Sequence, residues 1–332
     1  MVSICIPTYN QAPYIELAVR SVYNQTVKPF EIIVFDDCST DQTPQILEKL
    51  ALEIPILKVF RQPHNLGIAG NVDSCLRAAT GDLVVRLDSD DQLFPEYVEK
   101  LSALISEYPN AGYAHAAIQE VDQSNNFLNE RRLFRKTGFV TGETALMEAL
   151  KGYRVAANLI MFRREALVAV NYLAGRPNFG EDYHMASAIS AAGYGNVYLN
   201  EILGYYRVWV DVGNVRQKRK LSEIDGIRRV FDDVLAPAFQ RNGWGLTKVN
   251  QTRVNFAVRQ SDCLGWDIYS EPEKEELVTA IYKLSSAPKV KFFVWLHSNK
   301  MGGLFKLFSN LKSVPKSIIK RSVLKLQTSR AK

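Results

Sequence analysis

The feature that most restricts the fold is a regular alternation of apolar runs and helical stretches in the first 120 residues. The apolar runs are short, rich in valine and isoleucine, and typical of strands buried on both faces: 2–7, 30–37, 54–60 and 82–88. The stretches between them have helical spacing or helical end signals: 14–25, 43–53 and 68–79. In the second stretch, Thr43 is the expected N-cap and Pro44 takes the first helical position. This alternation predicts βαβ units and an α/β fold with a doubly wound, mainly parallel sheet flanked by helices.

Polar and aromatic residues follow three of these predicted strands. The strand ends carry Pro7, Thr8 and Tyr9 after the first, Asp37 after the second, and an acidic run at 88–91 after the fourth. Because the carboxyl ends of parallel strands meet at one edge of a sheet, and ligands bind beyond that edge, we expect these residues to share a site.

Three carboxylates, Asp88, Asp90 and Asp91, crowd together directly behind the fourth strand. Mg²⁺ or Mn²⁺ would cancel their repulsion, keep some waters and bridge to a substrate diphosphate. A calcium loop would place Asp88, Asp90 and Glu99 at positions 1, 3 and 12, but Leu93 stands where that loop requires glycine. A solvated acidic turn is the ordinary reading of an isolated Asp-x-Asp string. The strand context and Asp37 favour the metal site.

Other chemistries lack their sequence marks. The chain has no G-x-G-x-x-G after the first strand, no G-x-x-x-x-G-K-[ST], no H-E-x-x-H, no cysteine quartet and no G-x-S-x-G. These absences argue against a nicotinamide enzyme, a phosphate-loop enzyme, a zinc enzyme and an α/β-hydrolase. The four cysteines are far apart and predict a reducing compartment without disulfides: Cys5, Cys38, Cys75 and Cys263.

The expected location is cytoplasmic. The start, MVSICIPTYN, lacks a charged n-region and a long apolar stretch, and no run approaches the ~18 apolar residues of a membrane span. Residues 289–332 hold eleven Lys or Arg and no Asp or Glu, whereas residues 1–288 carry 30 basic and 35 acidic side chains. The body is therefore mildly acidic with a basic tail. No nucleic-acid partner is expected.

The rest of the chain predicts a looser second half and a helical extension. Strand-like segments and one helix, EDYHMASAISAAG, occupy about 110–210, and later segments have helical patterns. The expected organisation is one domain at 1–210, with halves at 1–110 and 111–210. A helical extension at 211–288 and a basic amphipathic tail at 289–332 follow.

Five segments, in this order, carry a resemblance to a known family: VSICIPTYNQAPYIELAVRSVYNQT, FEIIVFDDCSTDQT, HNLGIAGN, ATGDLVVRLDSDDQLFP and FGEDYHM. Over about residues 1–210 the chain resembles the family 2 glycosyltransferases of the bacterial surface-polysaccharide type, which have the GT-A fold. The resemblance implies inverting transfer of a sugar from a nucleotide-diphosphate sugar, usually with Mn²⁺ or Mg²⁺. It also implies that 1–210 is the catalytic domain, with a nucleotide-sugar-binding half at 1–110 and an acceptor half at 111–210.

The resemblance also implies roles on the donor side. The nucleotide site carries over onto Pro7, Thr8, Tyr9 and Asp37, with Asp37 accepting from a uracil-type base N–H. Asp88 and Asp90 would hold ribose, diphosphate and metal, Asp90 being the expected direct ligand, and Asp91 would orient the site or bind the donor sugar. Asn65, in HNLG, matches a donor-side turn. Tyr9 as a strand-end aromatic and Asp37 as a turn former remain alternatives.

On the acceptor side, the resemblance implies that the second acid of GEDYHM, Asp182, is the general base. Inversion needs a carboxylate to remove the proton of the acceptor hydroxyl as that oxygen attacks the anomeric carbon. Glu181 would then orient the acceptor or the base. Two acids that only stabilise a helix N-terminus would fit the same pattern.

Two departures from the family limit what it implies. Many relatives carry a histidine after Tyr-Arg close to the metal, where this chain has Val208 and Trp209. The Q-x-x-R-W motif of processive synthases is missing, so one sugar per encounter is expected. The leading reading is a metal-dependent inverting glycosyltransferase that builds surface polysaccharide or glycolipid, its donor UDP- or dTDP-linked and its acceptor a glycan or a lipid-linked hydroxyl. A sugar nucleotidyltransferase and a non-catalytic nucleotide-sugar-binding module are the alternatives, and the oligomeric state is left open.

The basic tail predicts contact with an anionic membrane surface, on the inner face of the cell membrane. An apolar helical stripe contains Leu304, Leu307, Phe308 and Leu311, with lysines away from its centre. Basic amphipathic helices of this kind lie in a membrane interface. Packing on the body or a subunit contact is the alternative.

Overall fold

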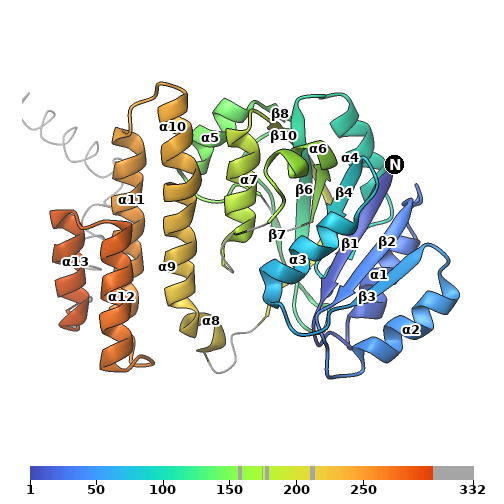
Figure 1. Cartoon of the computed structure of the whole chain (residues 1–332), viewed down its shortest axis with the longest axis horizontal. Helices are drawn as coiled ribbons and strands as arrows, with labels where there is room; N and C mark the ends of the chain where they lie inside the picture. The colour runs from blue at the N-terminus through green and yellow to red at the C-terminus, as the bar shows by residue number, and fades with distance from the viewer. Residues whose placement is uncertain (156–158, 174, 176–178, 210–213, 302–332) are drawn as a thin grey trace, which may run out of the picture. The chain divides into compact units, whose positions relative to one another are not determined.

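The structure is a computed structural model that describes residues 1–155, 159–173, 175, 179–209 and 214–301 (Figure 1). The chain divides into two compact units, Met1–Thr252 and Arg253–Lys332. Within the described ranges, no helix has both the length and the apolar character that crossing a membrane requires. The expected division at 210 and 288 stays a prediction.

The expected alternation of strands and helices is confirmed in the first hundred residues. The elements there are β1 (Val2–Thr8), α1 (Ile15–Tyr23), β2 (Glu31–Asp36), α2 (Thr43–Glu53), β3 (Leu57–Arg61), α3 (Gly67–Ala78), β4 (Leu83–Arg86), β5 (Gln92–Leu93) and α4 (Tyr97–Ser106). The expected N-cap of α2 is wrong by one residue, because the cap is Gln42. The hydroxyl of Thr43 instead accepts a hydrogen bond from the Gln11 backbone N–H at 2.9 Å, which ties the loop after β1 to α2.

The second half completes a single mixed sheet. Its elements are β6 (Ala111–Val121), β7 (Phe127–Arg131), β8 (Gly138–Val140), α5 (Gly142–Ala149), β9 (Ile160–Arg163), α6 (Arg164–Ala169), α7 (Glu181–Ala191) and β10 (Gly195–Arg207). The strand order is β3-β2-β1-β4-β9-β6-β10-β5, with β7 on β6 and β8 on β10. Pairing is parallel from β3 to β4 and between β6 and β10, while β9 runs antiparallel between β4 and β6.

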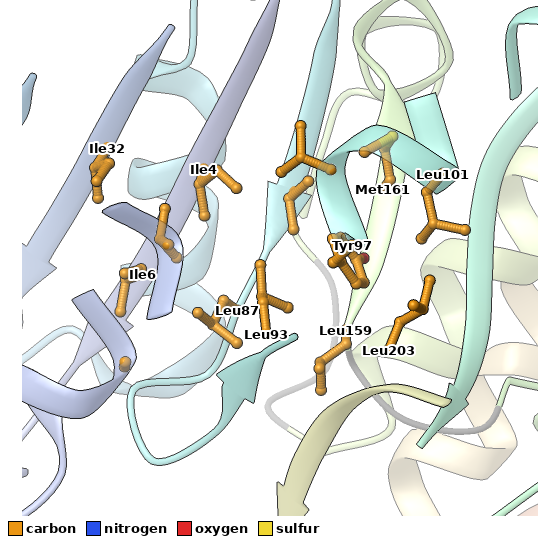
Figure 2. Close-up of a cluster of buried hydrophobic side chains, with 14 of the residues drawn as sticks. Ile4, Ile6, Ile32, Leu87, Leu93, Tyr97, Leu101, Leu159, Met161 and Leu203 are labelled. Atoms are coloured by element: carbon orange, nitrogen blue, oxygen red, sulfur yellow. The ribbon is translucent and has the colours of Figure 1, made fainter. Parts of the chain in front are cut away.

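Helices cover both faces of this sheet, as the expected α/β architecture requires. Successive side chains of a strand point to opposite faces. Ile4 and Val85 pack on one face with apolar residues of α1, α2 and α4, the cluster that Figure 2 shows. Cys5 and Val84 pack on the other face with apolar residues of α3, α6 and α7. Figure 1 labels these three helices. Each fully buried isoleucine or valine contributes roughly 1.5–3 kcal/mol relative to exposure, so the apolar runs hold the strands in place and leave the strand ends for polar residues.

The C-terminal part is helical, as expected. The first unit ends with α8 (Val215–Lys218), α9 (Lys220–Arg229), the π-helical turn η2 (Val230–Leu235) and α10 (Ala236–Arg241), and α11 (Thr247–Gln260) crosses the unit boundary. The second unit contains the 3-10 turn η3 (Ser261–Gly265), α12 (Glu271–Leu284) and α13 (Pro288–Ser298).

The segment expected to be a basic tail begins with a folded helix. Val290, Val294 and Leu296 of α13 are buried, and α13 contacts η3 and α12 within the second unit. The stripe of Leu304, Leu307, Phe308 and Leu311 lies outside the described residues.

Candidate active site

The loops after β1 and β2 are fastened to each other at the carboxyl edge of the sheet. Pro7 and Thr8 are the last residues of β1, and they lie opposite Phe35 and Asp36 of β2. The backbone N–H of Asn10 donates to Ser39 Oγ at 2.8 Å, and the Thr40 N–H donates to Asn10 Oδ1 at 2.8 Å. Asn10 adopts a positive φ of 52°, a conformation that asparagine tolerates better than most residues.

Tyr9 and Thr8 occupy opposite environments in this edge. Tyr9 is 45% exposed, so its ring is open to a ligand, whereas Thr8 is 3% exposed. The Thr8 hydroxyl is buried without a hydrogen-bond partner in the part of the chain that the structure describes. A flat, exposed ring beside a polar strand end is suited to stacking on a base or sugar, and the expected nucleotide contact of Tyr9 stays a prediction.

Asp37 organises the expected donor-side turn. Its carboxylate is 2% exposed and accepts the backbone N–H of Leu66 at 2.7 Å and of Gly67 at 3.0 Å. Asn65 Oδ1 accepts the same Gly67 N–H at 2.9 Å, and Gly67 has a φ of 75°. The structure therefore brings Asp37 and Asn65, both expected on the donor side, to the same Gly67 N–H, a contact that the sequence did not predict. The contacts made by Asp37 are to the turn, and its expected bond to a base stays a prediction.

Asp88 and Asp90 lie beyond the end of β4 and are both partly accessible. The Trp209 indole N–H, from the residues after β10, donates to Asp90 Oδ2 at 2.6 Å. Burial, and then the negative charge of Asp88, raise the pKa of Asp90 above its usual range. A group with a raised pKa for these reasons gains most from a nearby positive charge.

Asp91 is more deeply buried than Asp88 and Asp90, and it contacts the backbone of β10. It is 2% exposed, and its Oδ1 accepts the Arg207 backbone N–H at 2.7 Å, which fixes the end of β10. Burial, then the charges of Asp90 and Asp88, raise the pKa of Asp91 well above normal. Its other oxygen, Oδ2, is buried without a hydrogen-bond partner among the described residues. The expected contact with the donor sugar stays a prediction.

The donor set fits a divalent cation shared with a substrate. Among the residues that the structure describes, no group of three or more His, Cys, Asp or Glu side chains could hold a metal by itself. Mg²⁺ and Mn²⁺ sites often use one or two carboxylates and complete their shell with water and substrate phosphates. Asp88 and Asp90 supply two such carboxylates beyond the end of β4, and both are partly accessible.

Glu181 and Asp182 open α7, which starts after Gly180 in a left-handed conformation with φ 71°. Their carboxylates approach Arg86 at the end of β4: Arg86 Nη1 donates to Asp182 Oδ1, and Arg86 Nη2 lies 3.7 Å from Glu181 Oε1. Burial raises the pKa of Glu181, against the effect of the Arg86 charge. Stabilisation of the helix N-terminus and a role in chemistry are both compatible with this placement.

Sequence reasoning missed Arg86, although a charged residue inside the apolar run DLVVRLD was a visible signal. Its guanidinium also donates from Nε to Asp88 Oδ1 at 3.1 Å. Burial alone would lower the pKa of Arg86, but the charges of Asp182, Asp88 and Glu181 raise it above normal. The residue is 3% exposed. One buried cation thus joins the two carboxylate groups that the sequence assigned separately to donor and acceptor.

Sequence reasoning also missed a group of three side chains beside Asp90: Tyr14, Arg207 and Trp209. The Arg207 guanidinium lies 4.3 Å from the centre of the Tyr14 ring, and the Tyr14 and Trp209 rings meet edge to face at 5.5 Å. Arg207 Nε also donates to the backbone oxygen of Asp90 at 2.9 Å. No sequence signal links these residues, because the contact joins the loop after β1 to the end of β10.

Comparisons with known proteins show to which family the sequence belongs. The family model described as "Glycosyl transferase family 2" matches residues 3–169. The GalNAc(5)-diNAcBac-PP-undecaprenol beta-1,3-glucosyltransferase of Campylobacter jejuni is 38% identical over 114 residues, which cover 34% of this chain and 36% of that protein. The chondroitin synthase of Pasteurella multocida is 41% identical over 99 residues, 30% of this chain and 10% of that protein. The matched part thus spans about a third or less of these relatives.

Solved structures share the fold. TarS 1–349 of S. aureus in complex with UDP-GlcNAc superposes with a TM-score of 0.65 at 18% identity, covering 90% of this chain and 88% of that one. The mannosyltransferase PcManGT of Pyrobaculum calidifontis, in complex with GDP-Man and Mn²⁺, gives a TM-score of 0.54 at 20% identity, covering 92% and 86%. The likeness confirms the expected GT-A-type architecture. Because the family model spans half of the sequence and these strand-end carboxylates lie within it, the chain belongs to glycosyltransferase family 2 and is a glycosyltransferase.

Proposed function

We propose that the chain is an inverting, metal-dependent glycosyltransferase that moves one sugar per encounter from a nucleotide-diphosphate sugar to a hydroxyl of a glycan or lipid-linked acceptor. The observation that carries the proposal is the ion-pair cluster on Arg86, which joins Asp88 at the end of β4 to Glu181 and Asp182 at the start of α7. Arg86 therefore links Asp88, the proposed contact for metal and diphosphate, to Asp182, the proposed base.

The relatives support the substrate classes. TarS was solved with UDP-GlcNAc, the mannosyltransferase PcManGT with GDP-Man and Mn²⁺, and the name of the Campylobacter enzyme contains a lipid-linked acceptor, PP-undecaprenol. A UDP- or dTDP-linked donor and a role in surface polysaccharide or glycolipid synthesis are the corresponding expectations for this chain. With a lipid-linked acceptor, the enzyme would act at the inner face of the cell membrane.

On the donor side, the exposed ring of Tyr9 and the turn held by Asp37 provide a surface for the nucleoside, with Pro7, Thr8 and Asn65 shaping it. Mn²⁺ or Mg²⁺, held by Asp90 and Asp88 together with the donor diphosphate, would neutralise charge on the leaving group. The Trp209 N–H already holds Asp90 Oδ2, so the indole and the cation would share one carboxylate.

On the acceptor side, Asp182 removes the hydroxyl proton while the acceptor oxygen attacks the anomeric carbon. The new carbon–oxygen bond forms on the face opposite the diphosphate, and the bond to the diphosphate breaks with its electrons on the leaving oxygen. The proton ends on the Asp182 carboxyl and then passes to water. Glu181, beside it at the start of α7, would orient the acceptor or this carboxylate.

The test is a turnover assay across UDP-, dTDP- and GDP-sugars, with nucleoside diphosphate release and product configuration as readouts. We expect release from one donor class, dependent on Mn²⁺ or Mg²⁺, and a β-linked product from an α-linked donor. Exhaustive chelation should stop turnover, and added Mn²⁺ should restore it. Full activity after chelation would refute the metal, and a product of retained configuration would refute inversion.

The same proposal includes a membrane surface as partner. On α13, Phe292 is 56% and Trp295 is 54% exposed, with Lys289 and Lys291 exposed on the same helix. Residues 289–332 carry eleven basic and no acidic side chains. Aromatic and lysine side chains together suit the headgroup region of an anionic bilayer.

We therefore predict that the double variant Phe292→Ser, Trp295→Ser sediments less with anionic liposomes than the unaltered chain. A chain that ends at Met301 and keeps both aromatic residues should sediment less still. The cut lies at Met301 because α13 packs within the second unit, and removing it would expose the buried Val290 and Val294. Leu52→Ser, at a side chain 91% exposed on α2, is the matched control and should change nothing. Equal binding of all variants at low salt would exclude the membrane role.

A further inference from the structure

Arg86 is the last residue of β4, in the middle of the sheet, where its backbone lies between Cys5 of β1 and Ile160 of β9. An arginine buried at 3% exposure has lost its water, and such burial is tolerated only with good charge partners. Its partners are Asp88, Glu181 and Asp182. The residue therefore belongs to the carboxylate cluster and not to the apolar core on either side of it.

The period of the strand explains where Arg86 points. Val84, two residues earlier, packs with Met185 and Ile189 of α7. Because alternate residues of a strand share a face, Arg86 points to the face that α7 covers, one turn nearer the start of that helix. The helix begins at Glu181 and Asp182. The sheet thus aims the guanidinium at the acids that open α7.

Three different nitrogens of the guanidinium serve the three acids. Nε lies 3.1 Å from Asp88 Oδ1, Nη1 donates to Asp182 Oδ1, and Nη2 lies 3.7 Å from Glu181 Oε1. A guanidinium is planar, and its donors point in fixed directions. The relative placement of Asp88 and Asp182 is therefore set by one rigid group, although 94 residues separate them in sequence.

We propose that Arg86 is a positioning residue for transfer, which holds the base Asp182 at a fixed distance and orientation from Asp88 and the donor diphosphate. The inference rests on the proposed role of Asp182. Reaction rates are sensitive to such placement, since a displacement of 1 Å can cost about 10²-fold. A lysine would keep the charge but presents one compact ammonium on a flexible stem, so it cannot hold both acids in register.

The experiment is a double-mutant cycle on the single-turnover rate of sugar transfer with Arg86→Lys, Asp182→Asn and the double variant. We expect Arg86→Lys to lower the rate by about 10-fold to 10²-fold while nucleoside diphosphate affinity, measured by calorimetry, changes little. In the Asp182→Asn background the same change should add almost nothing, because residues that act through one another are not additive. Full additivity, or an undiminished rate for Arg86→Lys, would overturn the proposal.

Arg163→Lys is the matched control. Arg163, on β9, also lies in the sheet but pairs with Leu83 at the opposite end of β4, and it donates to the backbone oxygens of Ala111 and Tyr108. The Arg163→Lys variant should at most have a lower free energy of unfolding, and its transfer rate should equal that of the unaltered chain.

Asp182→Glu tests the same geometry if Arg86→Lys melts early. It keeps Arg86 and the charge but moves the carboxylate by one methylene, and a transfer rate equal to the unaltered chain would also refute fixed positioning. The two hypotheses fail in different ways. If the Asp182→Asn variant is active, Asp182 is not the base and the proposed function fails at that point. If this variant is inactive but the double-mutant cycle is additive, only the positioning role of Arg86 is refuted.

Discussion

Asp182→Asn is expected to reduce sugar transfer by about 10²-fold or more, the usual worth of a general base. Asparagine has nearly the same shape and keeps an oxygen that can accept from Arg86 Nη1, so the start of α7 should stay in place. Donor affinity should stay near that of the unaltered chain, because the binding surfaces at Tyr9 and Asp37 belong to other loops. The measurement is kcat with saturating donor, together with calorimetry of nucleoside diphosphate binding.

Two companion variants make this result specific. Glu181→Gln, one residue earlier and also near Arg86, should be less damaging, since Glu181 is expected to orient and not to remove the proton. Asp225→Asn, at an exposed acid of α9 that pairs with Arg228, should have no effect. An inactive Glu181→Gln beside an active Asp182→Asn would reverse the assignment of the base.

Asp90→Asn should abolish most turnover and weaken Mn²⁺-dependent binding of UDP while the fold persists. Charge stabilisation by a bound cation is worth several kcal/mol, and about 1.4 kcal/mol corresponds to a tenfold change in rate, so a loss of about 10²-fold or more is expected. Asparagine can still accept the Trp209 indole N–H, which preserves the contact between β10 and the edge. Calorimetry of UDP with and without Mn²⁺ separates loss of the cation from loss of the nucleotide site.

The matched control lies at the other end of the same strand. Asp82, which pairs with the amino terminus of Met1 at 2.9 Å, is an exposed acid far from the carboxyl edge, and Asp82→Asn should leave Mn²⁺ dependence unchanged. If Asp90→Asn kept both its turnover and its Mn²⁺ response, the cation would have to be held elsewhere.

The sequence predicted most of the first half of the fold for a local reason. A strand that is buried on both faces needs a continuous apolar run. The four apolar runs of the first 90 residues predict strands, and the structure has β1, β2, β3 and β4 there. Parallel connectivity also predicted that the ends of β1, β2 and β4 share one edge of the sheet. It did not predict that Asp37, after β2, and Asn65 both accept the backbone N–H of Gly67. The direction of β9 did not follow, because periodicity records burial and is the same for either direction of a strand.

What the sequence determined by itself is the set of elements and the carboxylates at the end of β4 and at the start of α7, because hydrophobic period and strand-end position are properties of short segments. Only the tertiary structure decided how these acids are used. Asp91 is fastened to the backbone of Arg207, Asp90 to the Trp209 indole, and Asp182 to Arg86. Each of those contacts spans about a hundred residues of chain and exists only because β10 and α7 return to the edge where β4 ends. A buried charge takes whichever partner the packing brings within reach, and that partner is a property of the assembled sheet.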